Sequence, residues 1–141
     1  MDIDKIAPGL ERLIEPGTVM DVVADGMHFG EGPVWDRREK LLYWVDIIGN
    51  SIWKWKPGVG KELVKHPTGF ANGMTFDHQA RLIVCGWSSR NVWRMEKDGS
   101  ITILTERCDG KKYNSPNDVV VRSDGWIYFT DSAGGLVNIE I

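Results

Sequence analysis

Short apolar stretches separated by polar turns run through most of this chain. After Glu31 the chain turns and becomes nearly continuously apolar over residues 41–48, as expected for a strand that is covered on both faces. Residues 51–56 alternate instead, with Trp53 and Trp55 on one side and lysines on the other, which is typical of a half-buried strand. A short outer strand follows a Pro-Gly break. This pattern predicts four strands of decreasing apolarity over residues 31–66.

The same layout occurs three times. Each copy begins with a carboxylate or amide residue, and the copies begin at Glu31, Asn72 and Asn117. A spacing of about 40–50 residues is typical of propeller blades. The repeats therefore predict an all-β fold, a β-propeller of four-stranded antiparallel blades, of which this chain carries about two and a half. We expect the blades at residues 31–66, 72–105 and, incompletely, 117–131.

The pattern also makes predictions outside and inside these blades. We treat residues 1–141 as one partial propeller domain, with residues 1–17 as an N-terminal segment in which Ile6–Ile14 form a helical turn or lie irregularly. Thr18–Ala24 are predicted to form one strand before the first blade. Trp126 and Phe129 are expected on an exposed flank of the third blade. Large apolar residues that recur at matching positions should be buried between blades: Trp35, Trp44, Trp53, Phe76, Trp93, Val121 and Phe129.

Composition narrows the classes of function. The formal net charge is −3 and the lysines and arginines are scattered, so no basic stripe indicates a nucleic-acid partner. The apolar runs are too short to span a bilayer, and the acidic N-terminus does not resemble a secretory signal. Two cysteines do not form a disulfide framework, which favours a reduced, cytoplasmic setting.

Candidate chemistry lies where the innermost strands begin. In a propeller these strands surround a common axis, so Glu31, Asn72, Asn117 and the neighbouring Asp118 should point towards one mouth. Carboxylate and amide oxygens are ligands that Ca²⁺ prefers. The alternative is that these side chains only hydrogen-bond the turns at the strand starts. No Cys/His cluster has the spacing of a zinc site.

Four motifs in this order carry a resemblance to a known family: GEGPVW (30–35), ANGMTFD (71–77), NSPNDVVV (114–121) and IYFTD (127–131). Together they resemble the gluconolactonase/senescence-marker-protein (regucalcin) family. The resemblance implies a six-bladed propeller, roughly twice as long as this chain, that binds one divalent metal, usually Ca²⁺, and hydrolyses sugar lactones. It implies that Glu31 is a metal ligand, that Asn117 lies at the metal or the substrate, and that Asn72 contacts the substrate or lines the cavity.

The chain also departs from the family pattern. The family's other metal ligands, and the Asp that serves as acid/base, belong to blades beyond residue 141, so no catalytic residue is assigned here. Residues 132–141 differ from the family. We therefore expect an incomplete lactonase that is inactive unless a second copy or a second chain closes the ring. The alternatives are a non-catalytic propeller fragment or binding module, and another propeller hydrolase of the phosphotriesterase type.

Overall fold

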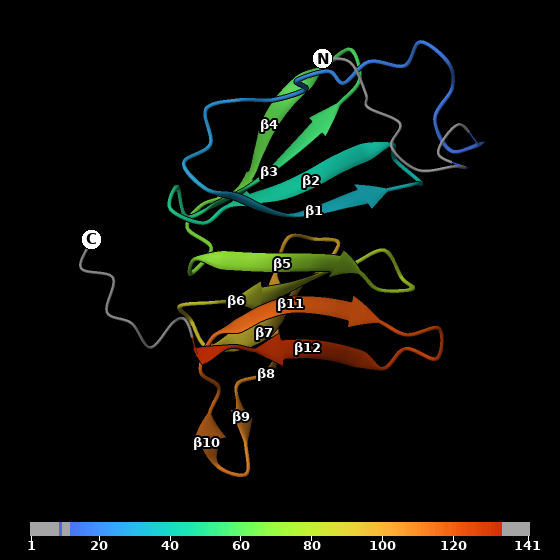
Figure 1. The fold of residues 1–141 in the computed structure, drawn as a ribbon. Helices are drawn as coiled ribbons and strands as arrows, with labels where there is room; N and C mark the ends of the chain where they lie inside the picture. Colours follow the sequence, from blue (N-terminus) through green and yellow to red (C-terminus); the bar gives the residue numbers. More distant parts are fainter. Residues whose placement is uncertain (1–8, 10–11, 134–141) are drawn as a thin grey trace.

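A computed structural model describes residue 9 and residues 12–133 of the chain (Figure 1). Two four-stranded antiparallel sheets follow one another in strand order, and two smaller pairs of strands complete the fold. The first sheet contains β1 (Gly30–Asp36), β2 (Leu41–Asp46), β3 (Ser51–Lys56) and β4 (Gly60–Lys65). The second contains β5 (Ala71–Phe76), β6 (Leu82–Gly86), β7 (Asn91–Met95) and β8 (Ile101–Thr105). The third is the pair β11 (Pro116–Val121) and β12 (Ile127–Asp131), preceded by the hairpin β9 (Arg107–Cys108) and β10 (Lys111–Lys112).

The all-β fold of four-stranded antiparallel sheets is confirmed, and every regular element between residues 30 and 131 is a strand. No helix in the described residues is long and apolar enough to cross a membrane. The small β9–β10 hairpin lies between the second and third predicted blades and was not predicted. The described residues contain twelve strands in all.

The predicted strand over Thr18–Ala24 is wrong. These residues form no strand, and Val22 is 74% exposed. Their apolar residues follow a strand-like pattern, but a strand forms only where a neighbour pairs with its backbone, and no described segment does so here. The predicted N-terminal turn falls mostly on residues 1–8, 10 and 11, which lie outside the described residues.

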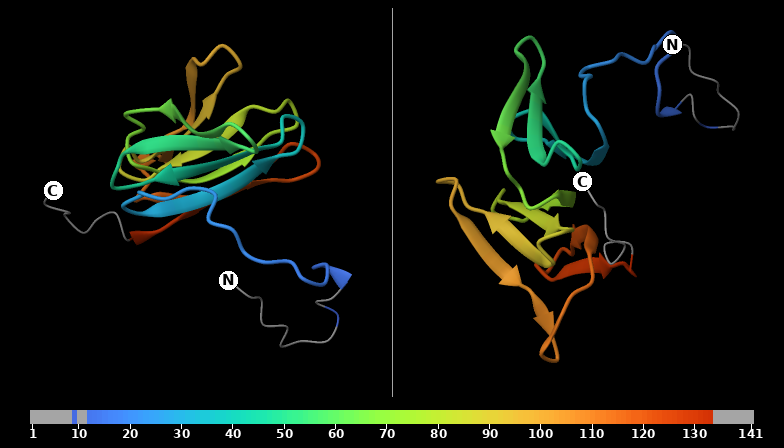
Figure 2. Two further views of the ribbon diagram at one scale, coloured as in Figure 1. Left: turned by 90° about the horizontal axis from the view of Figure 1, so that it is seen from above. Right: turned by 90° about the vertical axis from the view of Figure 1, so that its left-hand side faces the viewer.

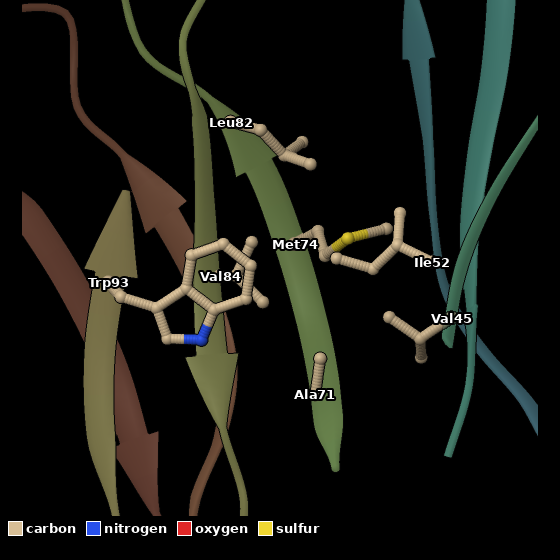
Figure 3. Packing of buried hydrophobic residues seen from close by; sticks show 7 residues of the cluster. All are labelled: Val45, Ile52, Ala71, Met74, Leu82, Val84 and Trp93. Carbon is tan, nitrogen blue, oxygen red and sulfur yellow. The ribbon is translucent and has the colours of Figure 1, made fainter. Parts of the chain in front are cut away.

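The three sheets pack face to face, as the stack in Figure 1 and the fanned view in Figure 2 show. We call the face of each sheet that looks toward the next sheet in the chain its leading face, and the opposite face its trailing face. Between the first two sheets, Ile52 and Val45 of the leading face lie opposite Met74 and Ala71 of the trailing face, and Trp93 lies beside Val84 in the same cluster (Figure 3). The edge of the Tyr43 ring also contacts Phe76, with the ring centroids 5.4 Å apart.

The second junction repeats the first. Ile83, Cys85 and Val92 form the leading face of the second sheet and pack on Val119 and Phe129 of the third. Full burial of such side chains contributes about 1.5–3 kcal/mol each, so these two layers hold the sheets together. The turns at the far end add polar links, because Arg38 donates to the carbonyl of His78 and His78 Nε2 donates to the carbonyl of Arg122.

The predicted core is confirmed in part. Trp44 and Trp93 are buried, while four others are half-buried: Trp53, Phe76, Val121 and Phe129. Trp35 is 44% exposed, so its predicted burial is wrong. It pairs with Leu42 on the trailing face of the first sheet, against which no sheet of the described residues packs. Trp126 is exposed as expected at 66%, whereas Phe129 is covered because it faces the second sheet.

Candidate functional site

Each first strand has an irregularity at the residue that the sequence singles out. The pairing register shifts between Glu31 and Val34 in β1, between Ala71 and Met74 in β5, and between Pro116 and Val119 in β11. A β-bulge bends a strand and re-aims the side chains beside it. Glu31, Asn72 and Asn117 therefore occupy equivalent bulged positions at the same end of three neighbouring strands.

Two glycines bring these bulges close together. A Cβ atom on Gly32, whose φ is +55°, would lie 2.5 Å from the carbonyl oxygen of Asn72. A Cβ atom on Gly73 would lie 2.6 Å from both the carbonyl oxygen of Asn117 and Oδ1 of Asp118. Real Cβ atoms do not come this near to a backbone oxygen, so both positions require glycine. The spacing between the three site residues is set by backbone-to-backbone contact rather than by intervening side chains.

A cavity of about 240 Å³ opens at this point. It is lined by Glu31, Asn72, Asn117 and Asp118, together with Gly32, Pro33, Gly73 and Met74. The structure thus brings together all four polar residues that the sequence placed at one mouth. Glu31 borders the bulge of β1, Asn72 lies in that of β5, and Asn117 and Asp118 both lie in that of β11.

The hydrogen bonds separate these polar residues into two kinds. Asp118 Oδ1 accepts the backbone N–H of Val119 at 2.9 Å, so this carboxylate supports its own strand. Among the described residues, the side chains of Glu31, Asn72 and Asn117 take part in no hydrogen bond or ion pair, although Asn72 is only 9% exposed. The alternative in which these three merely stabilise turns therefore has no support in the structure. Their oxygens stay available to a ligand in the cavity.

The chain entering each of these strands is held by a side-chain acceptor. Asp46, at the end of β2, accepts the backbone N–H groups of Phe29 and Gly49 on Oδ1 and that of His28 on Oδ2, each at 3.0 Å. Burial of Asp46 opposes its ionisation, but these backbone hydrogen bonds outweigh it and lower the pKa of the carboxyl below its usual value. Asp46 remains charged and fixes the two residues that precede Gly30 and Glu31.

The other two entries are held in related ways. Asp131, at the end of β12, accepts the N–H groups of Asn114 at 2.9 Å and Ser115 at 2.7 Å, shortly before Asn117. In the second sheet the equivalent position is Gly86, which pairs with Ala71. Here the chain is held by Asn50, from the turn between β2 and β3 of the first sheet. Its Oδ1 accepts the backbone N–H groups of Thr68 and Phe70 and the hydroxyl of Thr68.

These three anchors were not predicted from the sequence. A signal was present, since an aspartate closes the second strand of both the first and the third repeats. A polar residue at a strand end, however, is also common in ordinary turns. The role of Asn50 could not be predicted because it depends on a contact from the first sheet to the chain that enters the second.

The donors in the cavity fit a hard cation better than a soft one. Glu31 and Asp118 supply carboxylates, and Asn72 and Asn117 supply amide oxygens, the groups that Ca²⁺ and similar ions prefer. Within the described residues no group of three or more His, Cys, Asp or Glu side chains could hold a metal. Cys85 is not a candidate ligand, because burial, reinforced by the nearby Asp118 carboxylate, raises the pKa of its thiol to about 12.

Stacked antiparallel sheets whose first strands share an oxygen-lined cavity define a β-propeller with an axial polar site. A family model described as "SMP-30/Gluconolactonase/LRE-like region" matches residues 29–138. The chain belongs to this family.

Individual proteins similar to this chain are named as lactonases. A gluconolactonase of Zymomonas mobilis is 28% identical over 98% of this chain, and a pentonolactonase of Haloferax volcanii is 30% identical over 84%. A solved gluconolactonase structure from Xanthomonas campestris superposes with a TM-score of 0.80 at 35% identity over 83% of this chain. The chain spans only 43%, 40% and 39% of the lengths of these three proteins.

Proposed function

We propose that this chain supplies part of the axial metal site of a sugar-lactone hydrolase. Glu31 and Asn117 are the metal ligands in this proposal, and Asn72 and Asn117 contact the substrate. The observation that carries it is that Glu31, Asn72 and Asn117 line one cavity. Their side chains have no hydrogen-bond or ion-pair partner among the described residues. A buried polar side chain with a purely structural role would be expected to have a hydrogen-bond partner, and Asn72, the buried member of the three, has none in the described chain.

The ion in this proposal is Ca²⁺ or another divalent metal, which when bound would act as a Lewis acid on the lactone carbonyl. Glu31 provides a negative charge in the cavity that favours any cation there. Asn72 and Asn117 offer both an oxygen acceptor and an N–H donor, so they can orient the hydroxyl groups of a sugar lactone. The tight backbone contacts at Gly32 and Gly73 hold these side chains in place before any ligand arrives.

The relatives support a lactone as the substrate, because two of them are named as a gluconolactonase and a pentonolactonase. Since the chain spans less than half of each, the activity belongs to the assembled protein, and the acid/base aspartate is expected outside this sequence. A cytoplasmic location is part of the proposal. It is supported by the free thiols of Cys85 and Cys108, the second of which is exposed.

The test compares Glu31→Gln with Glu39→Gln. Glu39 is an exposed residue in the turn between β1 and β2, at the opposite end of the same sheet, so its replacement makes the same chemical change away from the cavity. Calcium binding is measured by calorimetry, and hydrolysis of glucono- and pentonolactones by acid release. We expect the wild type and Glu39→Gln to bind calcium and Glu31→Gln to bind it at least tenfold more weakly. Lactone hydrolysis is expected only in the assembled protein that supplies the acid/base aspartate, and there too Glu31→Gln should lower the rate.

Two results would count against the proposal. Calcium binding that is unchanged in Glu31→Gln would remove Glu31 from the metal site. Calcium binding that depends on Glu31, without any lactone hydrolysis by the assembled protein, would favour the binding module over the enzyme.

A further inference from the structure

The turn between β2 and β3, residues 46–50, contacts the chain that enters two different sheets. At its start, Asp46 accepts two backbone N–H groups from the chain that enters β1, just before Glu31. At its end, Asn50 accepts two from the chain that enters β5, shortly before Asn72. One short turn therefore holds the strand entries of two residues that line the cavity.

The conformation of this turn is closely constrained. The N–H of Gly49 donates to Asp46 Oδ1 at 3.0 Å, and a Cβ atom on Gly49 would overlap the Asp46 carboxylate. The N–H of Asn50 donates to the carbonyl of Ile47 at 3.0 Å, and Asn50 has φ +49°, a left-handed conformation that asparagine tolerates. The two acceptors, Asp46 and Asn50, are therefore held at a fixed spacing.

From Asn50 a chain of hydrogen bonds reaches the residue before Asn72. Asn50 Oδ1 accepts the hydroxyl of Thr68 at 3.0 Å, and Thr68 Oγ1 accepts the backbone N–H of Ala71 at 3.0 Å. Thr68 is 6% exposed and Ala71 is 1% exposed, so these groups need partners within the protein. The N–H groups of Thr68, Phe70 and Ala71 thus all depend, directly or through one hydroxyl, on the amide oxygen of Asn50.

The side chain of Asn72 depends on this backbone for its direction. Its amide makes no hydrogen bond in the described chain. It also lies where the pairing register of β5 shifts, between Ala71 and Met74, so the regular ladder does not fix it. The bond from the N–H of Ala71 to Thr68 is the nearest hydrogen bond that holds the chain on the side from which it enters the bulge.

We propose that Asn50 and Thr68 are positioning residues for the sugar lactone, which act through Asn72 and do not affect the metal side of the cavity. This inference rests on the proposed function, in which Asn72 contacts the substrate and Glu31 binds the metal. The turn then has two arms, because Asp46 holds the strand of Glu31 and Asn50 holds that of Asn72. Loss of the second arm weakens binding of the lactone and leaves calcium binding unchanged.

Two pairs of variants separate this relay from general packing. Thr68→Val removes the hydroxyl at nearly constant shape, whereas Thr68→Ser keeps it. Asn50→Gly removes the acceptor and tolerates the left-handed backbone. Lys40→Gly makes the same kind of change at φ +55° in the exposed β1–β2 turn, at the opposite end of the sheet. Calcium affinity is measured by calorimetry, and KM and kcat for gluconolactone in the assembled protein that supplies the acid/base aspartate.

The relay variants Thr68→Val and Asn50→Gly should raise KM about three- to tenfold, as expected for one neutral hydrogen bond to the substrate. Calcium affinity and kcat should each change by less than about twofold, because substrate binding alone is weakened. Thr68→Ser and Lys40→Gly should match the wild type, and Thr68→Val alone provides the test if Asn50→Gly does not fold. An unchanged KM in the relay variants, or a calcium affinity that falls as much as KM rises, would overturn the proposal.

Removal of Asn72 shows whether the relay acts through this residue. In an Asn72→Ala background the side chain that the relay positions is absent, so Asn50→Gly should raise KM no further. A further rise of KM in this background would mean that Asn50 affects the site by another route, and would overturn the assignment to Asn72.

A magnetic resonance measurement on this chain does not depend on activity. The side-chain NH₂ signal of Asn72 is identified by its loss in Asn72→Asp. It should shift in Thr68→Val and Asn50→Gly and stay in place in Thr68→Ser and Lys40→Gly. A signal that stays in place in the relay variants overturns the relay, whether or not a lactone is hydrolysed. A signal that shifts as expected, in a protein whose assembled form hydrolyses no lactone, leaves the relay in place and refutes only the enzymatic function.

Discussion

Replacing Asp46 with asparagine tests the anchor that positions Glu31. The change keeps the shape of the side chain and removes its charge. Asp46 is 5% exposed, and its two oxygens accept three backbone N–H groups, two on Oδ1 and one on Oδ2. The asparagine side chain has only one oxygen, so its NH₂ group must replace one carboxylate oxygen and face a backbone N–H donor.

The expected cost follows from these bonds. Hydrogen bonds to a charged acceptor contribute about 1.5–3 kcal/mol and neutral ones about 0.5–1.5 kcal/mol. If the amide oxygen takes the place of Oδ1, the bonds from Phe29 and Gly49 each weaken by about 1 kcal/mol. The N–H of His28 then loses its acceptor, which costs about 1–3 kcal/mol. The free energy of unfolding should fall by about 3–5 kcal/mol at pH 7.

Urea unfolding followed by tryptophan fluorescence, at one fixed protein concentration, measures this difference. Asp109→Asn is the matched control, because Asp109 is exposed at the tip of the β9–β10 hairpin with φ +49°, a conformation that asparagine tolerates. We expect a change within about 0.5 kcal/mol there. A loss below about 1 kcal/mol in Asp46→Asn would refute the anchoring role.

The pH dependence gives an independent check. The pKa of Asp46 is lowered by folding, so its stabilisation is fully present above the unfolded pKa and disappears as the pH falls through the folded value. The gap between wild type and Asp46→Asn should therefore be largest above about pH 4 and shrink towards pH 2. A gap that widens on acidification would contradict the assigned direction of the shift.

Two further predictions concern packing. Gly73→Ala should lower the free energy of unfolding by about 1–3 kcal/mol and weaken calcium binding, because the new Cβ displaces the backbone of Asn117. Gly30→Ala, whose Cβ meets nothing nearer than 3.9 Å, should change stability and calcium binding little. Equal effects of the two substitutions would refute the close approach of the strands at Gly73. A thiol reagent at pH 8 should label Cys108 rapidly and Cys85 only after unfolding, because Cys85 is fully buried with its pKa raised to about 12. Two rapidly reacting thiols in the native protein would show that the second junction opens.

Much of the fold could be predicted because the propeller repeats its pattern. The bulged starts at Glu31, Asn72 and Asn117 were visible as a recurring polar residue before an apolar strand, and the structure gathers them into one cavity. Their role in binding a metal stays a prediction. Periodicity locates a strand but says nothing of which sheet lies beside it, which is why the burial predicted for Trp35 was wrong.

The residues that hold the strand entries also show that periodicity does not reveal contacts between sheets. Asp46 and Asp131 each hold the entry to a strand of their own sheet, whereas Asn50 reaches from the first sheet to the second. A repeat-based reading would look for an aspartate at position 86 and find glycine. The function of that missing carboxylate is carried by a residue that the repeat does not mark, and only the packing of the sheets reveals it.

The order glycine, glycine, aspartate at positions 32, 73 and 118 links the architecture to the site. Where glycine stands, the neighbouring backbone lies so close that a Cβ atom would clash with its carbonyl oxygen, and the polar side chains before each glycine are brought together. Asp118, at the equivalent position of the third sheet, instead adds a negative charge to the cavity lining. The same position therefore provides close packing in the first two sheets and attraction for a cation in the third.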